Sequence, residues 1–309
     1  IGSIAIAGNG DIYVGTGSEF DGAYGEGGSG FRGRGIWYSN DNGATFTMVD
    51  GTDPGEFGNS SSDFTAVDAL AAHPTINNQV WYGSIGSYGF LEDGIITEDP
   101  ASGTPSAVCD IAIASNASYM LLVATNGKVY RSTNSDFTDF ESISGSNSSS
   151  GILPQSGIGR CRIAIAPSDP NHVFALFATS GGSFHGLHYS NNAANIGSWS
   201  ECWPGGIDTS TPLERPQGIY DLALGIPVGQ PDLAYVGGIS LWRSGPFQQA
   251  EPAAAPIDIP GFPSGVHADI QDIVVAPSGT MYVTTDGGIY KSTDAVSYTH
   301  LTLPTTWSV

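Results

Sequence analysis

Basic residues are scarce in this sequence, which has nine lysines and arginines against 30 aspartates and glutamates and a formal net charge of -21. A surface of this charge repels the phosphate groups of nucleic acids and of anionic lipids, so we expect no nucleic-acid partner. No run of 18 or more apolar residues occurs, and the sequence therefore predicts no membrane-spanning helix and no insertion into a membrane.

Cysteine is rarer still. The three cysteines, Cys109, Cys161 and Cys202, have no C-x-x-C spacing, which argues against a zinc site. Two interpretations remain open, a disulfide between Cys161 and Cys202 or buried free thiols. No segment shows the pattern of a helix of ordinary length, whereas the 43 glycines and 19 prolines suit a chain with many turns.

A short strand pattern that ends in serine recurs along the chain. It consists of an apolar residue, an aromatic residue or histidine, a variable residue and serine, and its copies are Ile36–Ser39, Val129–Ser132, Leu187–Ser190, Leu241–Ser244 and Ile289–Ser292. The copies follow one another at intervals of about 50 residues, with a degenerate copy expected between residues 94 and 99.

A second pattern opens each unit, in which apolar and small residues alternate before a turn and a strand rich in β-branched and aromatic residues. Ile4–Ala7 before Ile12–Val14 and Ile163–Ala166 before Val173–Ala175 are two examples. Together the patterns predict an all-β fold, a β-propeller of about six four-stranded blades, with the last blade incomplete.

Residues 1–295 are expected to form this single propeller, as a fragment of a ring of seven or eight blades. Residues 296–309 are expected to be a non-native tail, because Val296 to Thr305 resembles the translation of a sequencing adapter. Within this tail, residues 299–303 alternate well enough to pair accidentally as a fourth strand.

The segment from Ser39 to Phe46 carries five residues at fixed offsets, namely Ser39, Asp41, Gly43, Thr45 and Phe46. In a turn between two antiparallel strands, the serine and aspartate side chains can bind backbone N–H groups that have left the ladder, and glycine can adopt a positive φ. We expect Phe46 to fold into the apolar layer of its blade. The motif is thus interpreted as structural rather than ligand-binding.

This motif resembles the Asp-box (BNR) repeat, and the repeated units resemble the propellers of sialidases, xyloglucanase-type glycoside hydrolases and sortilin-like domains. The resemblance implies a secreted or cell-surface protein in which the boxes lie at the blade periphery, away from any active centre. Only the first copy is complete, so the resemblance indicates a fold and no particular reaction.

The residue that precedes each inner strand forms a second candidate set. It is a carboxylate in four units, Asp68, Asp110, Asp221 and Asp272, and an arginine in a fifth, Arg162. These side chains should approach the mouth of the central channel, where they could hold Ca²⁺ or supply an acid and a base. Alternatively, each aspartate caps the entrance to its strand.

Further candidates lie in the loops between the second and third strands and in the links between blades, which share one face of a propeller. They are Tyr24, Glu26, Trp203 and His267 as ligand-binding residues and Asp286 as a carboxylate in Thr285–Gly288. The last segment resembles the surroundings of a catalytic aspartate in xyloglucanase-type hydrolases, although Asp-Gly is also a common hairpin turn.

The sequence therefore predicts a secreted module that binds extracellular polysaccharide or protein on this face and requires no cofactor. The alternative is a glycoside hydrolase, xyloglucanase-like rather than sialidase-like, with a carboxylate pair drawn from the five aspartates. Phe31–Arg34 does not match the F-R-I-P segment of sialidases, which disfavours that reaction.

Overall fold

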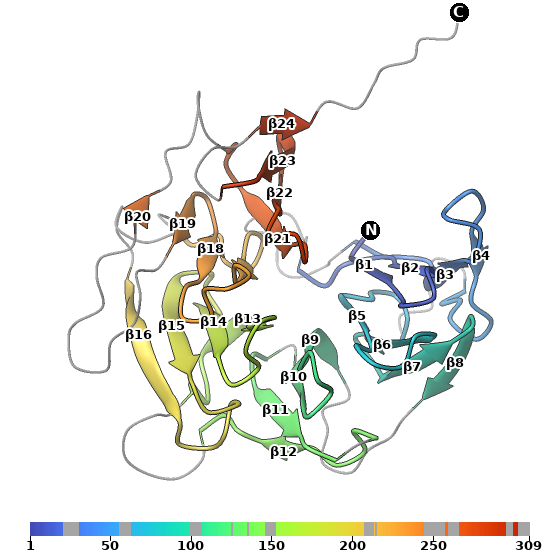
Figure 1. Ribbon diagram of the computed structural model, residues 1–309, viewed down its shortest axis with the longest axis horizontal. Helices are drawn as coiled ribbons and strands as arrows, with labels where there is room; N and C mark the ends of the chain where they lie inside the picture. Colours follow the sequence, from blue (N-terminus) through green and yellow to red (C-terminus); the bar gives the residue numbers. More distant parts are fainter. Residues whose placement is uncertain are drawn as a thin grey trace, which may run out of the picture.

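The structure is a computed structural model, and it describes residues 1–20, 31–55, 63–98, 107–124, 126–134, 136–145, 153–206, 213, 215–243, 257–258, 266–294 and 299–301. These residues form six antiparallel four-stranded sheets arranged as the blades of a propeller around a central axis (Figure 1). The described residues contain no helix. The prediction of an all-β propeller with six blades is confirmed.

Each blade uses four strands that follow one another in the chain. Blade 1 comprises β1 (Ser3–Ile6), β2 (Ile12–Gly15), β3 (Ile36–Ser39) and β4 (Thr47–Met48). Blade 2 comprises β5 (Ala69–Ala72), β6 (Gln79–Gly83), β7 (Tyr88–Glu92) and β8 (Ile95–Glu98). Blade 3 comprises β9 (Val108–Ile113), β10 (Met120–Ala124), β11 (Val129–Ser132) and β12 (Glu141–Ser142). Blade 4 comprises β13 (Ile158–Ile165), β14 (Val173–Thr179), β15 (Phe184–Ser190) and β16 (Trp199–Gly206). Blade 5 comprises β17 (Ala223–Gly225), β18 (Tyr235–Gly237), β19 (Leu241–Arg243) and β20 (Ile257–Asp258). Blade 6 comprises β21 (Ile270–Val275), β22 (Met281–Thr285), β23 (Gly288–Ser292) and β24 (Thr299–Leu301).

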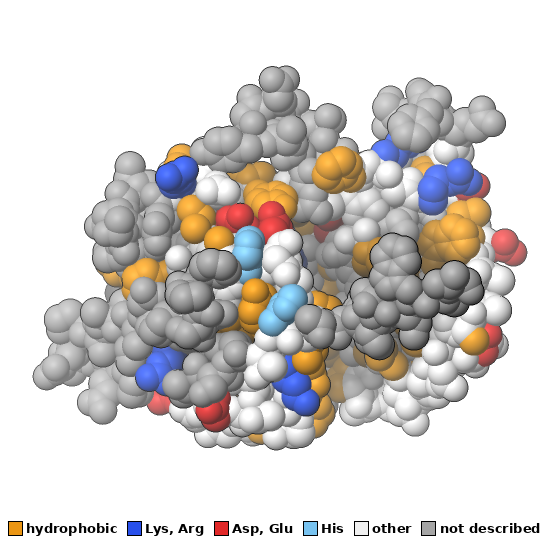
Figure 2. Space-filling model, turned by 90° about the horizontal axis from the view of Figure 1, so that it is seen from above, with side chains coloured by type: hydrophobic (Ala, Val, Ile, Leu, Met, Phe, Trp, Pro, Cys, Tyr) orange, Lys and Arg blue, Asp and Glu red, His pale blue; other side chains and the backbone are white. Residues whose placement is uncertain are grey.

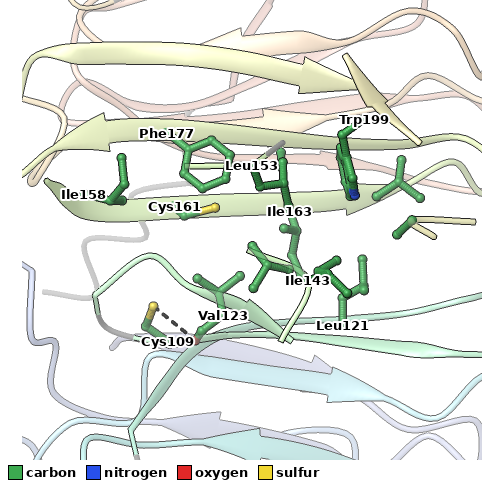
Figure 3. Close-up of a cluster of buried hydrophobic side chains, with 14 of the residues drawn as sticks. Cys109, Leu121, Val123, Ile143, Leu153, Ile158, Cys161, Ile163, Phe177 and Trp199 are labelled. Carbon is green, nitrogen blue, oxygen red and sulfur yellow. Dashed lines mark hydrogen bonds between the residues drawn. The ribbon is translucent and has the colours of Figure 1, made fainter. Parts of the chain in front are cut away.

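The alternation in each inner strand sends neighbouring side chains to opposite faces of the blade. In β13, Ile163 packs toward blade 3 while Ala164 packs toward blade 5. Five apolar clusters result, and each joins two successive blades. Figure 3 shows the cluster between blades 3 and 4, where Leu121 and Val123 of β10 face Ile163 and Phe177 of blade 4.

All three cysteines are buried free thiols. Cys109 and Cys161 belong to the cluster in Figure 3, and Cys109 Sγ donates to the carbonyl oxygen of Val123 at 3.5 Å. Burial raises the pKa of each thiol, which disfavours the reactive thiolate form. The free-thiol interpretation is therefore the one that the structure bears out.

The turn after β3 is closed by side chains of the motif. Ser39 Oγ accepts from the amide of Gly43 at 2.9 Å, and Asp41 Oδ1 accepts from the amide of Thr45 at 2.9 Å. The hydroxyl and amide of Thr45, followed by the hydroxyl of Ser39, lower the pKa of Asp41 to about 2. Asn42 and Gly43 have φ values of 58° and 81°, which suits their residue types.

The serine that ends the third strand is buried in every blade where a described copy exists. The buried copies are Ser39, Ser132, Ser190 and Ser292. Ser132 Oγ donates to Asn134 Oδ1 at 2.5 Å and Ser292 Oγ donates to Asp294 Oδ1 at 3.0 Å, as Ser39 does to Asp41 at 2.8 Å. The repeated serine is thus a turn-closing residue.

The expectation that Phe46 is buried is wrong, because 39% of the residue is exposed. The equivalent aromatic residues Phe140 and Trp199 are buried, and each packs toward the preceding blade. Phe46 belongs to blade 1, whose corresponding face is not covered by another sheet. Its ring instead lies close to Gly43 of its own turn.

Blade 6 has four strands, because β24 pairs with β23 through Ile289–Leu301, Tyr290–His300 and Lys291–Thr299. All three residues of β24 are exposed. The expected pairing of this segment is therefore observed, whereas its non-native origin stays a prediction. The degenerate motif copy between residues 94 and 99 overlaps β8, and no loop separates β7 from β8 beyond Asp93 and Gly94.

Truncation of the two equivalent aromatics distinguishes covered from uncovered faces. We expect Phe140→Ala to lower the free energy of unfolding by about 3–5 kcal/mol, since a cavity forms between blades 2 and 3. Phe46→Ala should cost only about 1–2 kcal/mol, since part of its ring is already in water. Urea denaturation measures both, and equal costs would show that Phe46 is covered in solution.

Candidate functional site

A central cavity of about 880 Å³ is enclosed by the inner strands and by loops of one face of the propeller. The charged side chains in its wall, with Tyr220 and Gln271, come from blades 2 to 6: Asp68, Asp110, Arg160, Arg162, Tyr220, Gln271, Asp272 and Asp286. Four of the five carboxylates proposed from the sequence, and Arg162, therefore meet at one cavity. The loop residues Ser18, Phe20 and Phe31 belong to the β2–β3 connection, on the face where binding is predicted.

Asp68, Asp110 and Asp272, here called the ring carboxylates, line the cavity from three different blades. Backbone amides partly neutralise their charge. Asp110 Oδ1 accepts from the amide of Ile111 at 3.0 Å, and its Oδ2 accepts from the amide of Ile163 in the next blade at 2.9 Å. Asp68 Oδ1 accepts from the amide of Glu19 in the preceding blade at 3.2 Å. The Asp68–Glu19 and Asp110–Ile163 bonds join neighbouring blades, so neither is a cap on the aspartate's own strand.

Two arginines balance this charge. Arg160 Nη1 donates to the carbonyl oxygens of Ile219 and Tyr220 at 2.8 and 2.7 Å, and its guanidinium lies 4.8 Å from the ring centre of Phe20. Arg162 Nε donates to the carbonyl oxygen of Leu222 at 3.1 Å, and its Nη1 lies 3.8 Å from Asp110 Oδ1. Burial raises the pKa of Asp110, and Arg162 opposes that rise.

Asp272 binds the amide of the following residue, Ile273, at 2.9 Å and is exposed to the cavity. Among the side chains that the structure describes, no three of His, Cys, Asp or Glu converge as metal ligands. A Ca²⁺ site at this ring stays a prediction, for which calcium titration is the test.

Asp286 lies at the rim and is the best connected exposed carboxylate of the site. Thr285 pairs with Gly288, so Asp286 and Gly287 form the two-residue hairpin turn that the sequence favours. Tyr220 Oη donates to both oxygens of Asp286, at 2.9 and 3.0 Å, and Gln271 Nε2 donates to Oδ1 at 3.2 Å. A carboxylate, a phenol and an amide from blades 5 and 6 thereby form one polar cluster.

Asp221, the fifth ring candidate, does not line the cavity and is fully buried. Neither carboxylate oxygen accepts a hydrogen bond from a donor among the described residues. Burial, followed by the nearby carboxylate of Asp269, raises the pKa of Asp221 to about 8. This raised pKa favours the protonated form of Asp221 at neutral pH.

Several sequence-based candidates lie elsewhere. Trp203, predicted to bind a ligand, is a core residue with ring centres 5.0 Å from Phe184 and 5.7 Å from Trp242. Its strand β16 turns it toward blade 5, which removes it from the surface. His267 packs over Gly287, with Nδ1 3.0 Å from the carbonyl oxygen of Ala268, and touches the rim. Tyr24 and Glu26 lie outside the described residues.

Sequence reasoning missed Glu19, Arg160, Tyr220, Gln271 and Asp269 as site residues. Arg160 lies two residues before Arg162 on β13, and Tyr220 directly precedes Asp221, so their positions next to repeat residues were the available signal. No sequence pattern pointed to Glu19, because this residue lies in the β2–β3 loop and its amide meets Asp68 only in the folded chain.

The comparisons with known proteins identify relatives of the fold only. The sequence matches no protein-family model and no curated protein. One solved structure that resembles the chain is a GH74 enzyme from Niastella koreensis, with a TM-score of 0.57 and 14% identity; the match covers 97% of this chain and 37% of the enzyme. Another is a catalytically inactive virginiamycin B lyase from Staphylococcus aureus, with a TM-score of 0.58 and 14% identity; the match covers 98% of this chain and 84% of the lyase. A third is the extracellular domain of a protein described as a hybrid two-component system from B. thetaiotaomicron (TM-score 0.53, 14% identity, 94% and 38%).

At identities of 14%, these likenesses show a shared propeller fold. The chain spans less than two fifths of the length of the GH74 enzyme and of the two-component system domain. The neighbours differ in their printed activities, so the fold alone selects none of them. In the described part of the chain, no helix has the length and apolarity required to cross a membrane.

The buried acid Asp221 makes stability depend on pH. Its pKa is higher in the folded chain than in the unfolded chain, so its contribution is complete below about pH 4 and is lost as pH rises toward pH 8. We expect this residue to lower the free energy of unfolding by up to ~1.4 kcal/mol per pH unit in that window. Asp221→Asn should remove that slope between pH 5 and pH 8.

Urea denaturation across this pH range measures the effect, with Asp93→Asn as the matched control because Asp93 is an exposed carboxylate on another blade. Parallel curves for the unmodified chain and Asp221→Asn would mean that Asp221 is ionised at neutral pH. Such a result would require a partner for its carboxylate.

Proposed function

We propose that this chain is an extracellular binding module whose ligand, a polysaccharide or a segment of another protein, docks at the rim of the central cavity. The resemblance of its turns to Asp-box repeats supports an extracellular location, as does the extracellular domain among the structural neighbours. The excess of acidic residues also suits a protein that remains soluble without a nucleic-acid partner.

The observation that carries the proposal is the contrast between the ring and the rim. The ring residues Asp68, Asp110 and Arg162 bind backbone groups or each other across blade boundaries. The rim cluster consists of the exposed Asp286 and the half-buried Tyr220 and Gln271, and it offers both donors and acceptors next to apolar surface. Such a mixed polar and apolar concave surface is typical of ligand sites.

Tyr220 gives the rim an aromatic face with a hydroxyl group, which suits the alternating apolar and polar faces of a sugar ring. The phenol is oriented by two hydrogen bonds to Asp286. A ligand hydroxyl could share the same carboxylate. We therefore favour polysaccharide over protein as the ligand class.

A glycoside hydrolase is the second candidate function, and one observation favours it. The backbone amide of Glu19 binds Asp68, and burial followed by the Asp68 carboxylate raises the pKa of Glu19 to about 6. A carboxyl group that titrates near neutral pH beside a second carboxylate is typical of acid–base catalysis. The GH74 enzyme among the structural neighbours has the same type of fold as this chain.

The proposal predicts that the chain binds a soluble polysaccharide without cutting it. Calorimetry against a panel of plant and microbial polysaccharides, with an assay for released reducing ends, tests both points. Tyr220→Phe and Asp286→Asn should each weaken binding about tenfold, because each breaks the rim cluster and a tenfold change corresponds to ~1.4 kcal/mol. Asp93→Asn, remote on the surface of β7 and β8, should bind like the unmodified chain.

Two outcomes would overturn the binding assignment. Equal affinities for all variants would place the ligand elsewhere. Release of reducing ends that Glu19→Gln abolishes would instead establish the hydrolase.

A further inference from the structure

Blade 6 and blade 1 flank the point where the ring should close, and this junction differs from the other five. Each of the five apolar clusters joins successive blades from blade 1 to blade 6, and no cluster of described residues joins blade 6 to blade 1. The inner strands also pack in sequence from β1 to β21 without a comparable contact between β21 and β1. Figure 1 shows these two blades separated beside the N-terminus.

On the blade 1 side, a face that other blades bury is open to solvent. Ile4 of β1 is 57% exposed. In four other blades the equivalent inner-strand residue, which packs toward the preceding blade, is only 5–9% exposed: Ile111, Ile163, Leu224 and Ile273. Phe46 is exposed on blade 1 for the same reason, since its equivalents Phe140 and Trp199 pack toward the preceding blade.

Blade 6 also has an apolar residue open to solvent, on the face that would pack toward a following blade. Ile289, the second residue of β23, is 45% exposed. Its equivalents at the same position of the third strand, which pack toward the following blade, are 0–3% exposed: Ile36, Val129, Leu187 and Leu241.

Apolar side chains continue across both faces. On blade 1, the aligned row runs from Ile4 through Val14 and Trp37 to Met48. On blade 6, Ile289 is aligned with Leu301, and Val274 of β21 is exposed as well. Figure 2, seen from the upper side of Figure 1, shows apolar side chains reaching the surface beside acidic and histidine side chains.

We propose that these two faces form a docking surface for one further four-stranded blade of the same repeat, carried on the same polypeptide in the natural protein. The chemistry of the occupant follows from the repeat. On blade 1 the uncovered face is the one that packs toward a preceding blade, and on blade 6 it is the one that packs toward a following blade. One additional sheet of this repeat has both of the faces that would pack against them.

The lengths of the structural neighbours agree with one additional blade. The matches to the virginiamycin B lyase and to a streptogramin B lyase cover 98% and 97% of this chain and 84% and 83% of those chains. About one sixth of each neighbour is left, close to the share of one blade in a ring of seven.

The added blade would also complete the candidate site. Ile4, Ile6 and Val274 line the same cavity as Asp272 and Asp286. A seventh inner strand between β21 and β1 would therefore close the side of the cavity that is apolar now. The ligand would then reach the rim cluster from the loop face alone.

Cysteine labelling of the full chain tests the proposal. Ile4→Cys and Ile289→Cys are treated with a maleimide, while the three native cysteines are buried and serve as an internal blank. Both introduced thiols should react as fast as an exposed thiol in the chain alone. After a copy of residues 153–206, the strands of blade 4, is added after residue 309, both rates should fall at least tenfold.

Ile95→Cys on β8 is the matched control, because Ile95 is 70% exposed away from the junction, and its rate should not change. Unchanged rates at Ile4→Cys and Ile289→Cys with a folded added blade would overturn the proposal. Slow labelling in the monomeric chain alone would show that the ring closes on itself and would overturn it too. Protection that grows with protein concentration would assign the surface to a second copy instead.

Discussion

The burial of one apolar sheet face against the next is the interaction on which this structure depends. Strand ladders connect only the four strands within a blade, so neighbouring blades are joined mainly by side-chain packing and a few polar bonds. Because the driving force is non-directional and proportional to the area removed from water, a blade is stable in the ring only where both of its faces are covered. Blades 2 to 5 meet this condition, whereas blades 1 and 6 each meet it on one side.

The polar centre is a consequence of the same packing. Inner strands that converge bring residues at one repeat position of successive blades to the same cavity, and carboxylates at these positions would repel one another unless neutralised. Asp110 achieves this through the amide of Ile163 and the guanidinium of Arg162, both from the next blade. The ring therefore aligns the blades, and the rim, where Asp286, Tyr220 and Gln271 meet, is left to interact with a ligand.

The sequence could predict the blades because their determinants are local. The serine of Ile36–Ser39 closes its turn through Gly43, and the alternation in Ile163–Ala166 decides which side chain meets which blade. The exposure of Phe46 and the burial of Trp203 could not be predicted in this way, since each depends on the presence or absence of a neighbouring sheet. Likewise, Tyr220 and Asp286 are 66 residues apart in sequence and meet only when blades 5 and 6 pack together.

Hydrogen–deuterium exchange of the backbone amides tests the central claim most directly, because protection reports how strongly each blade is held in the ring. If sheet-on-sheet packing stabilises the blades, amides in the ladders of blades 3 and 4 should exchange slowest, and those of blades 1 and 6 should exchange fastest. Equal protection in all six blades would contradict the account, since it would mean that the faces between blade 6 and blade 1 are covered as well as the others.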